Sequence, residues 1–462
     1  MKAILACFVL CVVSTPGLAQ STATSSAVQL GPYEYETRPD HDAFRIYNPR
    51  KAPQPGDLLL IQGDRLAICG DSITEQKMYS RMIETYLTVC VPQLNITVRQ
   101  YGWSGEKTDG FLRRMEADCL TFNPTIATLA YGMNDSRYRP FDVTNGQWYE
   151  DHYTAIVRKF KDADVRVVVG SPGCAGKIAE WVKSRAGTLD EHNVHLCALR
   201  DIAMEVAQRE GVRFADIFWP MLQAQVFAPE QHHATAEKPY LVAGNDGIHP
   251  DWAGHVIMAW SMLRSMGLDG HIGTITIDPA AGTAEATEGH TVDSVKADTV
   301  HLTSARLPFC ARGDLDDFRS IRSGMTLVPF MDDLNRFVLN ANVDGSGQWK
   351  VTWSTMSDDG GADHPKEFSR QFSAEELRKG INLAWEFPDN PCCHVFDQVD
   401  QAVAAKQAYE TQQVKKSFHS REAKADFAAV VKSTEAERAP LAAAIAAAVK
   451  PVRHSIRLEQ MP

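Results

Sequence analysis

The chain has 462 residues, of which 44% are hydrophobic and 23% charged, a composition typical of a globular protein with a full catalytic domain and one or two smaller modules. Its formal net charge of -11 argues against a nucleic-acid partner, because phosphate binding needs a basic surface. Beyond the first segment no apolar run reaches membrane-spanning length, so we expect no stable membrane anchor in the mature protein.

The chain begins with the pattern of a signal peptide. One basic residue precedes an apolar core too short to span a bilayer, and two small residues, Gly17 and Ala19, follow it. We predict a signal peptide over 1–19, a mature protein that begins near Gln20, and a periplasmic or extracellular location. A buried N-terminal helix is the alternative. The polar, proline-bearing residues 20–55 are expected to form an N-terminal arm.

Eight cysteines remain after removal of the signal peptide, in a compartment where disulfides can persist. Cys69 lies within an apolar run and is expected to be buried as a small apolar residue. The sequence does not determine the connectivity of the others. Candidate pairings are Cys90 with Cys119, and Cys310 with Cys392 or Cys393.

Residues 56–270 alternate short apolar runs with longer helical stretches. The strand-like runs are 66–69, 96–98, 125–130, 165–170 and 212–214, and the helical stretches are 78–90, 109–120, 147–163, 189–210 and 252–266. Strands buried on both faces and joined by helical crossovers predict a parallel sheet of about five strands with helices on both sides. We assign this segment to a catalytic α/β domain, whose site should lie at the carboxyl ends of the strands.

Four polar motifs stand where those strand ends would meet. They are Gly70-Asp71-Ser72, a glycine-rich loop over 100–108, Gly132-Met133-Asn134-Asp135, and Asp246-Gly247-Ile248-His249. Acyl transfer needs a nucleophile, a base, a carboxylate that orients the base, and donors aimed at the oxyanion. Together the four motifs supply all of these parts.

We predict that Ser72 is the nucleophile, His249 the general base and then the general acid, and Asp246 the orienting carboxylate. The predicted oxyanion hole consists of the backbone N–H groups of Ser72 and Gly105 and the side-chain amide of Asn134. Each residue also has a structural interpretation, as a helix cap or a turn residue. Separate turns, however, have no reason to supply complementary chemistry.

Three neighbouring residues are predicted to be structural. Asp71 and Asp135 would tie loops through side-chain hydrogen bonds to the backbone. Gly102 would allow a positive backbone angle.

With these motifs in this order, the chain resembles the SGNH hydrolase superfamily, which includes the GDSL esterases and lipases. The family blocks fall on Gly70, Asp71 and Ser72, on Gly105, on Gly132, Asn134 and Asp135, and on Asp246 and His249. The resemblance runs from about Leu66 to His255 and implies a flavodoxin-like three-layer α/β/α sandwich. Met133 and Tyr101 depart from residues common in the family, and neither change removes a catalytic part.

Other candidate sites are weaker. His192 and His195 stand three apart on a predicted helix, and His232 and His233 lie in a loop, but no nearby cysteine or carboxylate completes a zinc set. The segment 340–345 is better interpreted as an Asp-Gly hairpin turn than as a calcium loop. We therefore assign no metal and no cofactor.

Beyond residue 270 the pattern changes. Residues 271–397 contain short alternating or β-branched runs, which predict an antiparallel, β-rich accessory module. Ser373 and Glu376 have the spacing of a helix-capping box. Residues 398–462 are rich in alanine and charge and predict a helical tail, with a break at Pro440.

The substrate is the least determined property. Trp103, Tyr131, Tyr138 and Trp148 stand in or just after the predicted site loops, where aromatic faces could stack on sugar rings, although packing is the alternative role of each. Export and the β-rich module favour a deacetylase acting on carbohydrate esters. The alternatives are a lipid or simple carboxylester hydrolase and, from another class, a secreted carbohydrate-binding protein on a hydrolase scaffold. Neither the ester and acyl group nor the oligomeric state can be derived from the sequence.

Overall fold

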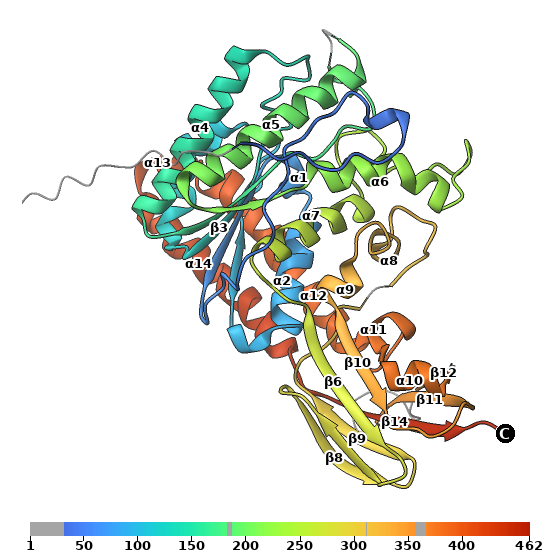
Figure 1. Cartoon of the computed structure of the whole chain (residues 1–462). Coiled ribbons are helices and arrows are strands. Elements are labelled where there is room, and N and C mark those ends of the chain that lie inside the picture. The colour runs from blue at the N-terminus through green and yellow to red at the C-terminus, as the bar shows by residue number, and fades with distance from the viewer. Residues whose placement is uncertain (1–31, 183–186, 311, 357–365) are drawn as a thin grey trace, which may run out of the picture.

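The computed structural model describes residues 32–182, 187–310, 312–356 and 366–462 (Figure 1). The predicted signal peptide, 1–19, and the start of the arm lie outside the described residues. Within the described part of the chain, no helix is long and apolar enough to cross a membrane.

Five parallel strands form the central sheet in the order β2-β1-β3-β4-β5. Their bounds are β1 Arg65–Gly70, β2 Thr97–Gln100, β3 Ile126–Ala130, β4 Arg166–Gly170 and β5 Arg213–Ala215. This sheet confirms the predicted α/β fold class. Because β2, β1 and β3 are neighbours, the polar motifs that follow them meet where the carboxyl ends of these strands lie side by side.

Helices cover both faces of this sheet. One face packs against α3 Thr108–Asp118, α4 Val143–Asp162 and α5 Leu189–Glu210, and the other against α2 Tyr79–Val89, α6 Phe218–Gln231 and α7 Trp252–Ser265. Successive side chains of a strand point to opposite faces of the sheet. In β1, Cys69 therefore packs in the core under α3 and α4, and Ile68 in the core under α2 and α7. The short runs of the sequence therefore fill two cores, which makes the domain a three-layer sandwich.

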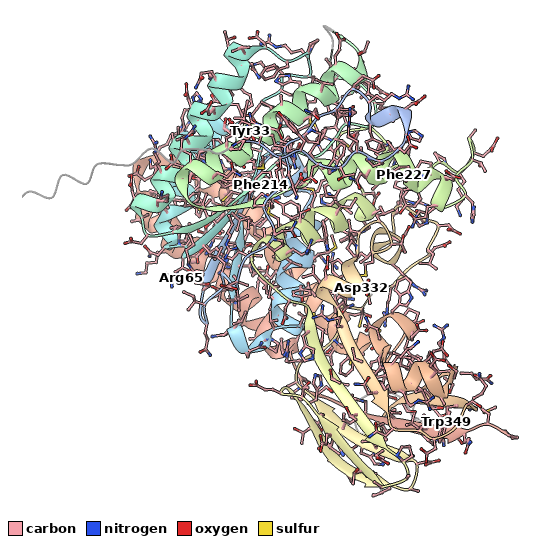
Figure 2. All side chains as sticks on the ribbon, in the orientation of Figure 1. Tyr33, Arg65, Phe214, Phe227, Asp332 and Trp349 are labelled. Atoms are coloured by element: carbon pink, nitrogen blue, oxygen red, sulfur yellow. The ribbon has the colours of Figure 1, made fainter. Side chains whose placement is uncertain are left out.

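The described part of the N-terminal arm lies across α5 and α6. Its 3-10 turn, η1 Asp42–Phe44, buries the Phe44 ring 5.5 Å from Trp219 and 5.5 Å from Phe227. The Arg50 backbone N–H donates to Asp201 Oδ1 at 3.3 Å. The arm is thus held by an aromatic cluster at one point and by a polar contact at another; Figure 2 labels Tyr33 and Phe227 in this region.

A second region contains two sheets, of order β13-β10-β6-β7 and β12-β11-β14-β9-β8. The strands are β6 His271–Asp278, β7 Thr283–Ala286, β8 His290–Lys296, β9 Thr299–Ser304, β10 Arg336–Ala341, β11 Gln348–Thr355, β12 Glu367–Ser373, β13 Ile381–Asn382 and β14 Val452–Gln460. The short helices are α8 Ile321–Gly324, α9 Phe330–Leu334, α10 Ala374–Lys379 and α11 Leu383–Glu386. The pairs are antiparallel except β6–β10, which is parallel. The capping box of Ser373 and Glu376 is confirmed at the start of α10.

The Asp-Gly hairpin predicted over 340–345 is wrong. The two strands that would form it, β10 and β11, belong to different sheets and do not pair with each other. Gly345 does have a positive φ of 76°, so a turn exists there. The turn carries the chain from one sheet to the other, because each strand finds its partners far away in the sequence.

The last part of the chain is helical, and these helices pack against the catalytic sheet. The elements are α12 Cys393–Gln412, the π-helix η4 Gln413–Ser417, α13 Arg421–Ala425 and α14 Phe427–Ala448. Pro440 lies inside α14, so the predicted break there is wrong; the alanine-rich sequence around it sustains the helix. The chain then ends in strand β14, where the sequence predicted only helix.

Strand β14 lies between β9 and β11 in its sheet. Its alternate residues Val452, His454, Ile456 and Leu458 are buried. The sequence does alternate buried and more exposed residues here, but the run is short and its more exposed face is polar. Figure 1 shows that β14 returns the chain to the β-rich region, and Figure 2 labels Trp349 there.

Charged side chains of the C-terminal helices close the edge of the catalytic sheet at β2. Val98 O accepts hydrogen bonds from Lys406 Nζ at 2.6 Å and from Arg438 Nη2 at 3.2 Å. The Gln100 N–H donates to Glu410 Oε2 at 3.1 Å. Lys406 also pairs with Glu84 of α2 at 3.0 Å, and its side chain is only 2% exposed. The outward backbone groups of β2 are therefore bound by buried charges rather than by another strand.

All eight cysteines of the described residues are free and buried. Cys90 and Cys119 belong to the two different cores, on opposite faces of the sheet, so the suggested pairing between them is excluded. The thiols of Cys310 and Cys393 share a hydrogen bond without a disulfide. Cys69 is fully buried, as predicted.

Replacing Lys406 by Met tests whether the β2 edge depends on this ion network. The change leaves Glu84 and Glu410 with less compensating charge in a buried place, and we expect the free energy of unfolding to fall by about 3 kcal/mol. Lys432→Met, on the exposed surface of α14, is the control and should change it by less than about 0.5 kcal/mol. Urea denaturation measures both, and equal stability of the two variants would contradict the expectation.

Candidate active site

Ser72 is the first residue of the short helix α1, Ser72–Glu75, which directly follows β1. Asp71 caps this helix, because its Oδ1 accepts the Ile73 N–H at 3.0 Å. The first N–H groups of a helix have no partner within it, so the backbone N–H of Ser72 is available at this corner. The local sequence thus places a hydroxyl and a backbone donor side by side at the end of a buried strand.

The turn before α7 brings His249 and Asp246 to Ser72. His249 Nε2 lies 2.7 Å from Ser72 Oγ, and His249 Nδ1 lies 2.7 Å from Asp246 Oδ2. Asp246 Oδ1 also accepts the His249 backbone N–H at 2.8 Å, which fixes the turn itself. Since Nδ1–H donates to the carboxylate, the Nε2 lone pair is left to accept the serine proton.

Asp246 is held in its ionised form. Burial raises its pKa, but hydrogen bonds from the backbone N–H groups of Ile248 and His249 and from the imidazole lower it more, so the pKa lies below its ordinary value. A carboxylate in this state can both orient an imidazole and stabilise the imidazolium that forms when the ring takes a proton.

Asn134 lies next to the Asp71–Ser72 corner, with its amide fixed on both sides. Its Nδ2 is 3.1 Å from Glu106 O and 3.3 Å from Asp71 Oδ2, and its Oδ1 accepts the Tyr138 hydroxyl at 2.8 Å. Tyr138 has a positive φ of 54°, an uncommon conformation that turns the chain back toward Asn134. The amide N–H group therefore points toward the Asp71–Ser72 corner.

The two buried carboxylates of the site loops bind backbone and hydroxyl donors. Asp135 accepts the Thr108 N–H at 2.9 Å and the Gly132 N–H at 3.0 Å, and so ties the second and third loops together. Burial raises the pKa of Asp135 to about 6 and that of Asp71 to about 7. Both play the loop-tying role predicted from the sequence.

The glycine-rich loop approaches α1 closely. A side chain at Gly102 would meet the Glu75 backbone nitrogen at 2.3 Å, so glycine is needed there for close approach. The positive φ predicted for Gly102 from the sequence is wrong. Gly105 has a φ of 75°, which favours glycine, and it lies exposed at the tip of the loop. Its backbone N–H is the donor that the sequence analysis assigned to the oxyanion hole.

The structure separates the four aromatic residues suggested for substrate binding. Tyr131 is 1% exposed and donates its hydroxyl to Glu106 Oε2 at 3.0 Å, so the proposed contact with substrate is wrong for this residue. An aromatic side chain that follows a strand can be either buried or exposed, and its position in the sequence does not distinguish the two. Tyr138 holds Asn134, and the Trp148 ring packs 4.4 Å from His152 on its own helix.

The fourth, Trp103, is partly exposed, and its ring meets His419 edge-on at 5.0 Å. This contact brings the C-terminal helical segment to the glycine-rich loop. Nothing in the local sequence around position 419 indicates such a position.

Trp181 lies beside His249 and was missed by the sequence analysis. It is 46% exposed, and its ring is 5.6 Å from that of His249 and 6.3 Å from that of Tyr138. The loop after β4 carries it, fastened by the hydrogen bond from Gly176 N to Gly247 O at 2.8 Å. The rule that sites form at strand ends applies to β4 as well and would have pointed to this loop.

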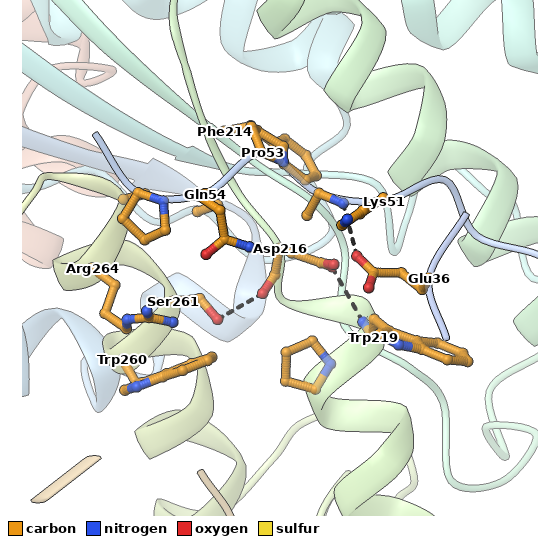
Figure 3. A pocket seen from close by; sticks show the side chains of 15 residues that line it. Glu36, Lys51, Pro53, Gln54, Phe214, Asp216, Trp219, Trp260, Ser261 and Arg264 are labelled. Atoms are coloured by element: carbon orange, nitrogen blue, oxygen red, sulfur yellow. Dashed lines mark hydrogen bonds between the residues drawn. The ribbon is translucent and has the colours of Figure 1, made fainter. Parts of the chain in front are cut away.

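A hollow of about 230 Å³ lies beneath the N-terminal arm (Figure 3). Its wall includes Trp219 of α6 and Trp260 of α7, at the β5 end of the sheet, whereas Ser72 follows β1. Arg264 in its wall is paired with Asp333 at 3.1 Å. This hollow is therefore separate from the Ser72 site.

Comparisons with known proteins agree with this architecture. A family model described as the GDSL-like Lipase/Acylhydrolase family matches residues 68–257. No curated protein sequence matches the chain. A solved gut microbial diltiazem-metabolizing enzyme is 22% identical, with a TM-score of 0.69 over 89% of this chain and 100% of that chain. This likeness supports the fold over both regions.

Two further solved structures cover less of the chain. A catalytic mutant of an acetylxylan esterase from Geobacillus stearothermophilus is 20% identical, with a TM-score of 0.37 over 46% of this chain and 97% of that chain. A GDSL-like lipase from Parabacteroides merdae is 21% identical, with a TM-score of 0.37 over 46% of this chain and 99% of that chain.

The family match begins within β1 and ends within α7. It therefore includes Ser72, Gly105 and Asn134 together with Asp246 and His249. Over residues 68–257 the chain is thus similar to the GDSL-like lipase/acylhydrolase family, and the protein is a carboxylic ester hydrolase.

Proposed function

We propose that this esterase removes acetyl or other short acyl groups from carbohydrate esters through a Ser72-His249-Asp246 triad. The observation that carries the catalytic part is the pair of 2.7 Å contacts that link Ser72 Oγ to His249 and His249 to Asp246. A hydroxyl, an imidazole and a carboxylate in line have the geometry of nucleophile, base and orienting group.

The reaction has two halves. Ser72 Oγ attacks the ester carbonyl carbon while His249 Nε2 takes its proton, and the tetrahedral intermediate then collapses as His249 returns that proton to the departing alcohol oxygen. Water next attacks the acyl-serine with His249 again as base. The carboxylic acid leaves and Ser72 regains its proton.

The negative oxygen of each tetrahedral intermediate would be stabilised by the N–H groups of Ser72 and Gly105 and by Asn134 Nδ2. In the free enzyme Asn134 Nδ2 has its longer contact, 3.3 Å, with Asp71 Oδ2. An oxyanion can replace that longer contact with little movement of the amide. Asp71 would thus hold the donor in place between turnovers.

The alcohol side of the ester is proposed to be a sugar. His249 protonates the leaving oxygen, so the alcohol must lie on the side of the imidazole, where the exposed ring of Trp181 stands 5.6 Å from His249. A flat aromatic face in this place can stack against a sugar ring. The signal-peptide pattern of residues 1–19 supports an enzyme that meets its substrate in the periplasm or outside the cell.

Ser72→Ala tests the nucleophile. We expect the release of acetate from a small aryl acetate to fall at least about 10³-fold, because the variant lacks the hydroxyl that lies against His249 Nε2 and would form the acyl-enzyme. Ser294→Ala, on strand β8, should retain the activity of the unchanged enzyme. Retained hydrolysis in Ser72→Ala would refute the assignment, and an unchanged enzyme inactive on every short ester would favour a carbohydrate-binding role.

Trp181→Ala tests the sugar platform. We expect KM for an acetylated oligosaccharide to rise about fivefold, since an aromatic stacking contact contributes about 1 kcal/mol, while KM for a small aryl acetate changes less than about twofold. Trp181→Phe keeps a flat ring and should retain most of the affinity. Equal effects on both substrates, or rates that increase with acyl chain length, would favour a lipid or simple carboxylester hydrolase.

Asp71→Asn tests the buried carboxylate. Because burial raises the folded-state pKa of Asp71 to about 7, the folded state keeps a proton that the unfolded state loses above about pH 4. The wild-type free energy of unfolding should therefore fall by roughly 2 kcal/mol from pH 5 to pH 7 through this group. Chemical denaturation at both pH values should give a smaller decline for the variant, and an equal or steeper one would contradict the expectation.

A further inference from the structure

Glu75 connects the nucleophile helix to the loop of the oxyanion hole. It ends α1, the helix that Ser72 begins, and its Oε2 accepts the Ser104 backbone N–H at 2.5 Å. Its side chain is 23% exposed. Because Ser104 immediately precedes Gly105, this hydrogen bond constrains the peptide next to a proposed oxyanion donor.

The glycine-rich loop is held at both of its ends by the catalytic domain itself. At one end Tyr101 O accepts from Arg114 Nη2 at 2.7 Å, and at the other Glu106 pairs with Arg114 at 2.6 Å. Between these points Ser104 and Gly105 are exposed. The Trp103 N–H donates to Gly70 O at 3.0 Å and the Glu106 N–H to Trp103 O at 3.1 Å, and the Glu75 carboxylate adds a side-chain anchor at Ser104 to these backbone hydrogen bonds.

A lysine from the C-terminal helices holds this carboxylate. Lys415 Nζ lies 2.8 Å from Glu75 Oε1 and 2.9 Å from Oε2, so it contacts both oxygens. The Lys415 side chain is 28% exposed, and its Nζ also lies 5.6 Å from the centre of the Trp103 ring. Without the ammonium group a half-buried carboxylate gains by turning toward water, which would release Ser104.

The segment that carries Lys415 is itself rigidly placed. It belongs to the π-helix η4, and π-helices occur frequently at functional sites. Val414 is buried in a core of the catalytic domain, and Phe418 stacks 5.6 Å from Phe122. His419 Nε2 lies 2.9 Å from Asp118 Oδ2. The lysine is thus presented by a surface that packs on the catalytic domain, over 300 residues later in the chain than Glu75.

We propose that Glu75 and Lys415 are positioning residues for the oxyanion hole, so that the C-terminal helical segment completes the esterase site. The inference rests on the proposed catalytic roles of Ser72 and Gly105. Neither side chain touches substrate: Glu75 holds the peptide before Gly105, and Lys415 holds Glu75. A donor displaced by a fraction of an ångström stabilises the tetrahedral intermediate less and leaves ground-state binding nearly unchanged.

The test compares Lys415→Met with Lys416→Met, its exposed neighbour on the same π-helix. For hydrolysis of an aryl acetate we expect kcat of Lys415→Met to fall about tenfold with KM within about twofold, which is less than the loss of a whole oxyanion donor. Lys416→Met should match the unchanged enzyme. Lys415→Arg keeps the charge and should restore kcat to within about threefold.

A second readout does not require ester turnover. A fluorophosphonate labels Ser72 by forming an O–P bond as fluoride leaves and the serine proton passes to His249, and the phosphoryl oxygen enters the oxyanion hole. The labelling rate of Lys415→Met should fall about as much as its kcat. Glu75→Gln keeps an acceptor for Ser104 but loses the ion pair, and its activity should fall to a similar extent. The double variant of Glu75→Gln and Lys415→Met should lose no more activity than either single variant.

The outcomes separate the two proposals. An unchanged enzyme that neither hydrolyses esters nor reacts with the fluorophosphonate would refute the proposed function. An active enzyme whose Lys415→Met variant keeps both kcat and labelling rate, or changes only in KM, would refute the positioning role. Thermal unfolding is recorded for each variant; if Lys415→Met does not fold, Glu75→Gln decides, and full activity in that variant would refute the role.

Discussion

The closure of the β2 edge by charged side chains is the interaction on which the rest of the structure depends. An edge strand exposes N–H and C=O groups that can pair with another chain. Here Lys406, Glu410 and Arg438 bind those groups and one another in a nearly water-free place. Buried charges are tolerated only as a matched set. The C-terminal helices and the catalytic sheet are therefore parts of one packed structure.

This closure has a consequence at the site, because the glycine-rich loop begins where β2 ends. The same helices that bind β2 continue into η4 and reach the loop at Trp103 and, through Glu75, at Ser104. The β-rich region joins the domain on the α2 and α7 side, where the Tyr86 hydroxyl donates to Leu334 O at 2.7 Å and Trp260 to Asp333 at 2.9 Å. The shape of an esterase site thus involves segments far outside the matched family region.

Carboxylates in the site have different roles because their surroundings differ. Asp246 is partly exposed and receives three hydrogen bonds from its own turn, so its ionised form is favoured beside His249. Asp71 and Asp135 are fully buried, which favours their protonated forms and makes them suited to holding loops rather than to catalysis. The proposed sugar side then lies where the β4 loop adds an exposed aromatic ring, a loop that can vary without altering the other strand ends.

The sequence by itself determined the parallel sheet and the residues now found together at Ser72, Asn134 and His249. Their signals are local, since each apolar run is followed within a few residues by its polar motif. Only the tertiary structure decided that Tyr131 is buried, that β14 is a strand and that Lys415 reaches the site. Those outcomes depend on partners tens to hundreds of residues away, and the burial or pairing of a side chain is a property of such partners rather than of its neighbours in the chain.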